Sequence, residues 1–215
     1  MTETPIRVAI VDDHAMVREA LSSVLGRTSD LKVVALGGDV PEARSIVRED
    51  PPDVLVLDYN LPQGNALDVL EEVQRRAPAV RVLVLTVHES LHYAIRVLEA
   101  GASGFLVKSS AVEELVDAIR QVHAGEIYIT SAVARRVLDQ LRRPRQERRG
   151  VASLSTREFQ LLSLLGAGMG IKEAARELKI GVSTASTYRA RLMSKLSLES
   201  TVDLIRFALE NKLVN

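Results

Sequence analysis

The chain contains no cysteine and no tryptophan, and aromatic residues make up only 3% of its 215 positions. Without cysteine it can form neither disulfides nor metal sites with thiolate ligands. No apolar run is long enough to cross a bilayer, and no basic segment followed by an apolar stretch opens the chain as in a signal peptide. The sequence therefore predicts a soluble cytoplasmic protein with no membrane partner.

A net charge of either sign is also absent, because 28 Lys and Arg balance 28 Asp and Glu. The balance is nevertheless uneven along the chain. Residues 1–130 carry 12 basic and 20 acidic side chains, whereas residues 131–215 carry 16 and 8. Halves of opposite charge suggest two modules with different partners, and the basic half suggests a polyanion, most simply nucleic acid.

The first 124 residues alternate between strand patterns and helix patterns. Strands are predicted at 6–11, 31–36, 53–58, 80–86 and 103–107, and helices at 14–26, 40–49, 65–76, 90–100 and 111–124. Five successive βα units predict an α/β fold with a five-stranded parallel sheet, doubly wound, with helices on both faces.

Polar side chains follow four of these strands, namely Asp12 and Asp13, Asp58, Thr86 and Lys108. Because parallel strands end at the same edge of a sheet, we expect these side chains to lie together. Carboxylates held close repel one another, and a divalent cation such as Mg²⁺ relieves that repulsion. Singly, each residue has a simpler explanation: acids favour helix starts, a threonine opens loops and a lysine is usually solvated.

In combination these residues resemble the flavodoxin-like receiver domain of bacterial two-component response regulators. The resemblance covers residues 5–124 and depends on Asp12-Asp13, Asp58 followed by Asn60-Leu61-Pro62, Thr86, Phe105 and Lys108. It implies that Asp58 accepts a phosphoryl group from a sensor histidine kinase. It further implies that Asp13, Asp58 and the main-chain carbonyl of Asn60 ligate Mg²⁺, with Asp12 acting through water.

The same resemblance assigns roles to three further residues. Lys108 and Thr86 would contact the phosphoryl oxygens, and Phe105 would pack into the space that Thr86 leaves when it moves. A purely structural role for Phe105 as a core residue stays open. Such a receiver catalyses only its own phosphorylation and dephosphorylation, so we do not expect an enzyme.

Residues 126–152 are predicted to be a linker between a receiver at 1–125 and a second domain at 153–215. A short basic helix is expected at 131–141. Proline, glycine and clustered arginines at 142–150 cannot form a core.

The last 63 residues show helical periodicity and no strand signal. Ser155 and Glu158 form a capping box that opens the first helix, and glycines at 166, 168 and 170 are expected to break it. The predicted helices span 156–167, 172–178, 182–196 and 199–211, with a glycine-containing turn at 179–181. Two helices joined by such a turn predict a helix-turn-helix at about 170–189.

The 182–196 helix has one apolar side and one side of small polar residues flanked by cations. A face of this kind suits a major groove, although an ordinary surface helix would explain it too. Residues 154–158, 172–175 and 186–196 resemble the LuxR-type DNA-binding module. The residues expected at DNA are Thr184, Ser186, Thr187, Tyr188, Arg189, Ala190, Arg191 and Lys195.

Together the two resemblances indicate a response regulator of the NarL/FixJ group, a transcription regulator switched at Asp58. The expected partners are double-stranded DNA, a histidine kinase and a second copy of the chain, with RNA polymerase as a further candidate. The dimer contact is expected on the last helix, at Val202, Ile205 and Leu209. An alternative is a phosphorylation-independent regulator whose receiver only mediates dimerisation or docking. A Mg²⁺-dependent phosphohydrolase would leave residues 153–215 unexplained.

Overall fold

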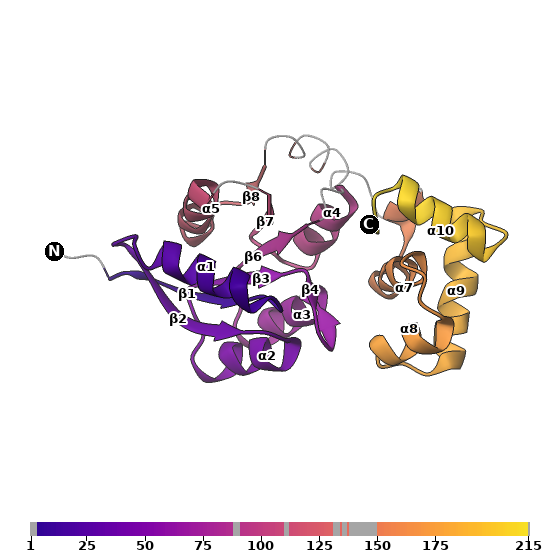
Figure 1. The fold of residues 1–215 in the computed structure, drawn as a ribbon, viewed down its shortest axis with the longest axis horizontal. Coiled ribbons are helices and arrows are strands. Elements are labelled where there is room, and N and C mark those ends of the chain that lie inside the picture. Colours follow the sequence, from indigo (N-terminus) through magenta and orange to yellow (C-terminus); the bar gives the residue numbers. More distant parts are fainter. Residues whose placement is uncertain are drawn as a thin grey trace. The chain divides into compact units, whose positions relative to one another are not determined.

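The computed structural model describes residues 4–87, 91–109, 112–130, 134, 137 and 150–214. It forms two compact units, one of Met1–Val87 with Val97–Ala134 and the other of His88–Arg96 with Arg135–Asn215 (Figure 1). Most of the basic helix expected at 131–141, and the arginine-rich segment after it, lie outside the described residues. None of the helices in the described ranges has the length and apolarity needed to cross a bilayer.

The first unit contains a parallel sheet with the strand order β2-β1-β3-β6-β7-β8. These strands are β1 Ile6–Val11, β2 Leu31–Gly37, β3 Val54–Asp58, β6 Arg81–Thr86, β7 Gly104–Val107 and β8 Tyr128–Ile129. The first five agree with the predicted strands to within one residue. The sixth corrects the expected strand number: β8 pairs with β7 through Tyr128 and Gly104. Two residues are too short for an alternating pattern to be recognised.

Helices connect the strands, and their bounds also agree with the prediction to within one residue. They are α1 Ala15–Leu25, α2 Val40–Glu49, α3 Ala66–Arg76, α4 Leu91–Glu99 and α5 Val112–His123. Two very short strands, β4 Asn60–Leu61 and β5 Gly64–Asn65, form an antiparallel hairpin before α3. The Asn65 side chain then caps α3 by accepting a hydrogen bond from the Leu67 N–H at 3.0 Å.

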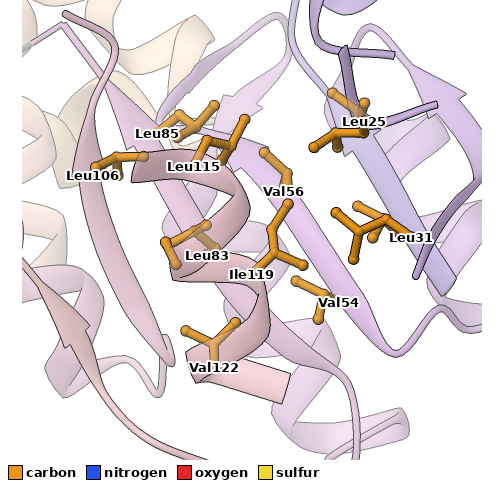
Figure 2. Close-up of a cluster of buried hydrophobic side chains, with 13 residues drawn as sticks. Leu25, Leu31, Val54, Val56, Leu83, Leu85, Leu106, Leu115, Ile119 and Val122 are labelled. Carbon is orange, nitrogen blue, oxygen red and sulfur yellow. The ribbon is translucent and has the colours of Figure 1, made fainter. Parts of the chain in front are cut away.

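The core of this unit lies on both faces of the sheet. Figure 2 shows the face covered by α1 and α5, where Val54, Val56, Leu83 and Leu85 meet the α5 side chain of Ile119. The alternate strand residues point to the other face and are also fully or almost fully buried: Ala9, Leu55, Leu57, Val82 and Val84. Burial on both faces explains why the strands are continuous apolar runs.

The strand order reverses between β1 and β3. The chain passes from β1 outward to β2 and then returns across β1 to β3. In an open α/β sheet such a reversal opens a crevice at the carboxyl ends of the two strands. The acids that follow β1 and end β3 therefore lie side by side at that crevice.

The second unit is helical in its described residues. It contains a 3₁₀ turn η2 at Gly150–Ser153 and the helices α7 Thr156–Gly166, α8 Ile171–Glu177, α9 Val182–Leu196 and α10 Thr201–Glu210. The predicted capping box is confirmed: Ser155 Oγ accepts from the Glu158 N–H, and Glu158 Oε2 accepts from the Ser155 N–H at 2.7 Å.

Gly166 does not break α7 but forms its last residue. A Cβ at this position would lie 2.4 Å from the Cβ of Ala208, so the glycine allows α10 to pack closely on α7. The turn that follows α7 uses Gly168, whose φ of +88° suits glycine.

Residues 91–96 of α4 group with this second unit, and two of their side chains are buried in it. The Tyr93 ring meets Phe159 edge-on with centroids 5.2 Å apart, and the Tyr93 hydroxyl donates to the Leu213 carbonyl at 2.7 Å. Arg96 donates to the Val151 carbonyl at 2.9 Å and lies 5.2 Å from the centroid of the Phe159 ring. No sequence pattern had predicted this cluster.

Candidate functional site

The acids at the carboxyl ends of β1 and β3 share one lysine. Lys108 Nζ lies 2.6 Å from Asp12 Oδ2 and 2.9 Å from Asp58 Oδ2. Asp12 and Asp58 are buried, and Lys108 is mostly buried. Three residues from three separate strand ends are therefore brought together, as their positions in the sequence predicted.

Asp13 lies at the same place but is more exposed. Its carboxylate is 2.6 Å from the Nδ1 atom of His14, which also lies 3.4 Å from Asp12 Oδ1. One ligand atom from each of Asp12, Asp13, His14 and Asp58 can be chosen so that all lie within 4.8 Å of one another. The sequence reasoning had missed His14, because a histidine opening a helix carries no recognisable metal motif.

The electrostatics of Asp58 differ from those of an ordinary surface carboxyl. Burial, opposed by the hydrogen bond and charge of Lys108 and reinforced by the charges of Asp12 and Asp13, raises the pKa of Asp58 to about 6. Burial alone would lower the pKa of Lys108, but its bonds to Asp12 and Asp58 outweigh this and raise the pKa. The site thus holds more negative charge than its one lysine balances.

The other predicted receiver residues lie around these groups. Thr86 ends β6 and is fully buried, and its carbonyl accepts a 2.7 Å hydrogen bond from the Lys108 N–H. Phe105 lies on β7 opposite Val84 of β6 and is also fully buried. Asn60 is exposed and pairs with Asn65 in the β4–β5 hairpin directly after β3.

The predicted helix-turn-helix corresponds to α8, a short turn and α9. Gly181 has an ordinary φ of −67° and occupies the N-cap of α9, where Ser, Thr, Asn and Asp are the usual residues. The left-handed residue is Lys179, with φ of 54°. A lysine in this conformation gives no composition signal, so the sequence located the turn but not its left-handed residue.

The polar side of α9 is exposed as predicted. Ala185 and Leu192 are buried against the other helices, and Tyr188 and Arg189 are partly exposed. The exposed residues among those expected at DNA are Thr184, Ser186, Thr187, Ala190, Arg191 and Lys195. The hydroxyls of Ser186 and Thr187 donate to carbonyls one turn earlier, at 2.9 and 3.1 Å, which holds both side chains close to the helix.

Two of the cations of α9 already have partners in the second unit. Lys195 Nζ lies 2.7 Å from Glu158 Oε2, and Arg189 donates to the Thr201 hydroxyl at 2.8 Å. Lys195 therefore ties α9 to the start of α7, and Arg189 ties it to the start of α10. Both residues have structural contacts that helical periodicity could not reveal.

The apolar side expected for dimer contact lies on α10. Val202 is 72% exposed and Leu209 is 51% exposed, with Ile205 partly exposed between them. Residues spaced by three and four positions share one face of a helix, so these three form an apolar stripe at the surface of the unit.

Comparison with known families matches both units. Residues 8–120 match the response regulator receiver domain, and residues 152–208 match the luxR family of bacterial regulatory proteins. The oxygen regulatory protein NreC of Staphylococcus epidermidis is 33% identical over 216 residues, which span 97% of this chain and 99% of NreC.

Solved structures share the fold. A LuxR-family two-component response regulator of Aurantimonas sp. has a TM-score of 0.60 at 33% identity, covering 64% of this chain and 99% of that one. RcsB of Salmonella enterica serovar Typhimurium, bound to promoter rprA in the presence of the phosphomimetic BeF3-, has a TM-score of 0.73 at 22% identity. That match covers 95% of this chain and 98% of RcsB.

Proposed function

Because the chain belongs to the two-component response regulators that join a receiver domain to a LuxR-type DNA-binding domain, we propose that Asp58 is the phosphoacceptor that switches its DNA binding. The observation that carries this assignment is the pairing of a buried carboxylate at a strand end with Lys108, 2.9 Å away. A sensor histidine kinase is the proposed phosphodonor. We take the domains to be 1–125 and 153–215, with the segment 126–152 between them adding β8 to the first unit and η2 to the second.

The acids fit a Mg²⁺ ion. Asp13 and Asp58 supply hard oxygen ligands of the kind that this ion prefers, the main-chain carbonyl of Asn60 is the proposed third ligand, and Asp12 is proposed to act through water. The pKa of Asp58 is raised chiefly by burial, with a further contribution from the charges of Asp12 and Asp13, so a cation bound here would offset the cost of ionising this carboxyl. When bound, Mg²⁺ neutralises charge on the incoming phosphoryl group and its acceptor.

The chain's own residues supply the rest of the transfer. An Asp58 oxygen forms the new bond to phosphorus while the bond from phosphorus to the kinase histidine nitrogen breaks. Lys108, now held between Asp12 and Asp58, donates to the oxygens of the transferred group and stabilises their charge. The protein modifies only itself in this scheme, so it is a switch and not an enzyme with a released product.

The phosphorylated state is proposed to move Thr86 and Phe105. Both side chains are fully buried on adjacent strands, so a shift of one has to be compensated by the other in a packed interior. The Thr86 hydroxyl would donate to a phosphoryl oxygen, and the Phe105 ring would occupy the space it leaves. A local change of charge thereby biases a two-state element.

DNA is the proposed target of the C-terminal helices. The exposed, short side chains of α9 suit a major groove, and the apolar stripe at Val202, Ile205 and Leu209 suits a second copy of the chain. Two copies would then read paired half-sites. RNA polymerase is the further proposed partner, and the cytoplasm the proposed place of action.

Labelling tests the assignment directly. Full-length protein is incubated with acetyl phosphate and Mg²⁺, and intact mass reports the phosphoryl groups gained. The wild type and a control, Asp117→Asn at an exposed position on α5, should each gain one group, whereas Asp58→Asn should gain none. Footprinting should show tighter DNA binding by the phosphorylated wild type than by Asp58→Asn.

Two results would contradict the proposal. Labelling of Asp58→Asn to the wild-type level would move the phosphoacceptor elsewhere. Labelling that requires Asp58 but leaves DNA binding unchanged would reduce the receiver to a dimerisation or docking module.

A further inference from the structure

His14 occupies the N-cap of α1 but does not cap it. N-cap positions favour side chains that accept a hydrogen bond from the first turn of the helix. The His14 side chain makes no such bond. Its Nδ1 atom instead lies 2.6 Å from Asp13 Oδ1 and 3.4 Å from Asp12 Oδ1. The imidazole is thus directed at the acids and not at the helix.

The backbone holds His14 at the same place. Its N–H donates to Asp12 Oδ1 at 2.9 Å, so the residue is tied to the buried acid through the main chain as well. The ring itself is 68% exposed, which leaves it room to turn. A ligand nitrogen therefore lies at the exposed side of a cluster whose buried side is formed by Asp12, Asp58 and Lys108.

The spacing of these groups is close to that of a coordination sphere. Ligand atoms from Asp12, Asp13, His14 and Asp58 lie within 4.8 Å of one another. Ligands on opposite sides of a divalent ion stand about 4.0–4.4 Å apart, because each bond is about 2.0–2.2 Å long. Adjustments of a few tenths of an ångström would bring the atoms of Asp13, His14 and Asp58 onto one ion, with Asp12 acting through water.

We propose that His14 is a ligand of the divalent ion in this site and makes it selective for Mn²⁺ over Mg²⁺. The inference builds on the proposed function, since it takes the acids to be a cation site. Mg²⁺ prefers oxygen ligands and gives up its water reluctantly, whereas divalent transition ions accept imidazole nitrogen readily. One nitrogen among the oxygen ligands therefore shifts the preference of the site toward Mn²⁺.

A different role for His14 makes a different prediction. If the imidazole only supplies a hydrogen-bond partner for Asp13, its removal changes the affinities for Mn²⁺ and Mg²⁺ by the same factor. If the imidazole is a ligand, its removal weakens Mn²⁺ binding and leaves Mg²⁺ binding nearly unchanged. The ratio of the two affinities therefore separates the roles.

The experiment compares full-length wild type, His14→Asn and His14→Ala with the control His123→Asn, whose histidine is exposed at the end of α5. Asparagine is a good N-cap, so His14→Asn is expected to keep α1 intact. Mn²⁺ binding is followed by electron paramagnetic resonance, and Mg²⁺ binding by competition. The Mn²⁺ to Mg²⁺ affinity ratio should fall about tenfold or more in both His14 variants and stay constant in the control.

Spin-echo spectroscopy of the Mn²⁺-loaded protein gives a second readout. The wild type and His123→Asn should show nitrogen coupling from a bound imidazole, and both His14 variants should lack it. An unchanged ratio, or a wild-type spectrum without nitrogen coupling, would overturn the role of His14 while leaving the Mg²⁺ site in place. Failure of the wild type to bind either ion would overturn the proposed cation site itself.

Discussion

Two lysines, one in each unit, hold a buried carboxylate, and the two pairs behave differently. Lys108 lies 2.9 Å from Asp58, and Lys195 lies 2.7 Å from Glu158. Asp58 is 4% exposed and Glu158 is 3% exposed. Yet the pKa of Asp58 is raised to about 6, whereas the pKa of Glu158 is lowered.

The difference lies in the other neighbours of each acid. Burial raises the pKa of Glu158, but the hydrogen bond from Lys195 and those from the Ser155 N–H and hydroxyl outweigh it. For Asp58, burial and the charges of Asp12 and Asp13 raise the pKa, and only Lys108 lowers it. Glu158 is therefore satisfied within the chain and serves the fold. Asp58 needs a further positive charge, which is the property expected of a functional carboxylate.

Removing each lysine should show the largest contrast between the two pairs. Lys108→Met leaves Asp12 and Asp58 buried without their cation, so the free energy of unfolding should fall by about 3–4 kcal/mol at about pH 8. Lys195→Met should cost only about 1 kcal/mol, because Ser155 still donates to Glu158 and the Lys195 side chain is 40% exposed. Urea denaturation with EDTA present measures both values.

Equal losses in the two variants would contradict the comparison. They would mean that Asp58 is no more dependent on its lysine than Glu158, and that the acids of the first unit are compensated in some other way. Addition of Mg²⁺ sharpens the test, since it should restore stability to Lys108→Met and have little effect on Lys195→Met.

The second largest expected contrast is in how Asp58 and Glu158 make the stability of the protein depend on pH. The folded pKa of Asp58, about 6, exceeds its ordinary value of 3.8. Its stabilising contribution is therefore present below about pH 4 and lost as pH rises through 6. This shift in the pKa of Asp58 corresponds to about 2 kcal/mol in the free energy of unfolding, once solvent relaxation is allowed for. Glu158 has a lowered pKa, so its contribution is present above 4.5 and lost only at more acidic pH.

Denaturation in EDTA at about pH 5 and pH 7.5 measures this difference. The wild type should lose stability across the interval, Asp58→Asn should lose less, and Glu158→Gln should follow the wild type. A decline in Asp58→Asn as steep as in the wild type would assign the titration to another group.

Asp12, Asp58 and Lys108 could be predicted to meet because parallel strands bring their carboxyl ends to one edge. That argument needs only the strand bounds, which long apolar runs define well. The helices of both units were predictable for a similar reason, since amphipathic periodicity and the Ser155–Glu158 box are local signals.

Other features of the structure could not be predicted, because they depend on contacts between residues distant in sequence or on single torsion angles. Lys195 lies toward the polar flank of α9 by periodicity, and only the fold reveals that its ammonium reaches Glu158, 37 residues earlier. Lys179 adopts a positive φ in the predicted turn, a backbone torsion that the residue type does not signal. The direction of the His14 ring is a rotamer choice that no spacing rule encodes. Short strands such as β8 give too few residues for a pattern.

The smallest expected effect is on DNA affinity, when the cationic side chains of α9 are removed one at a time. Arg191 is exposed, whereas Lys195 is held by Glu158 and Arg189 by Thr201. An arginine that neutralises one phosphate releases about one counterion, so Arg191→Ala should weaken binding to any duplex by up to about tenfold. It should also reduce the slope of log affinity against log salt by about one.

Lys195→Met is the matched variant, and it should leave the salt slope nearly unchanged. Fluorescence anisotropy with a labelled duplex between about 50 and 200 mM salt gives both slopes. An equal reduction in both variants would show that Lys195 exchanges Glu158 for a phosphate on binding. Glu158 would then lose its lysine in the complex, and the contrast with Asp58 would hold only for the protein without DNA.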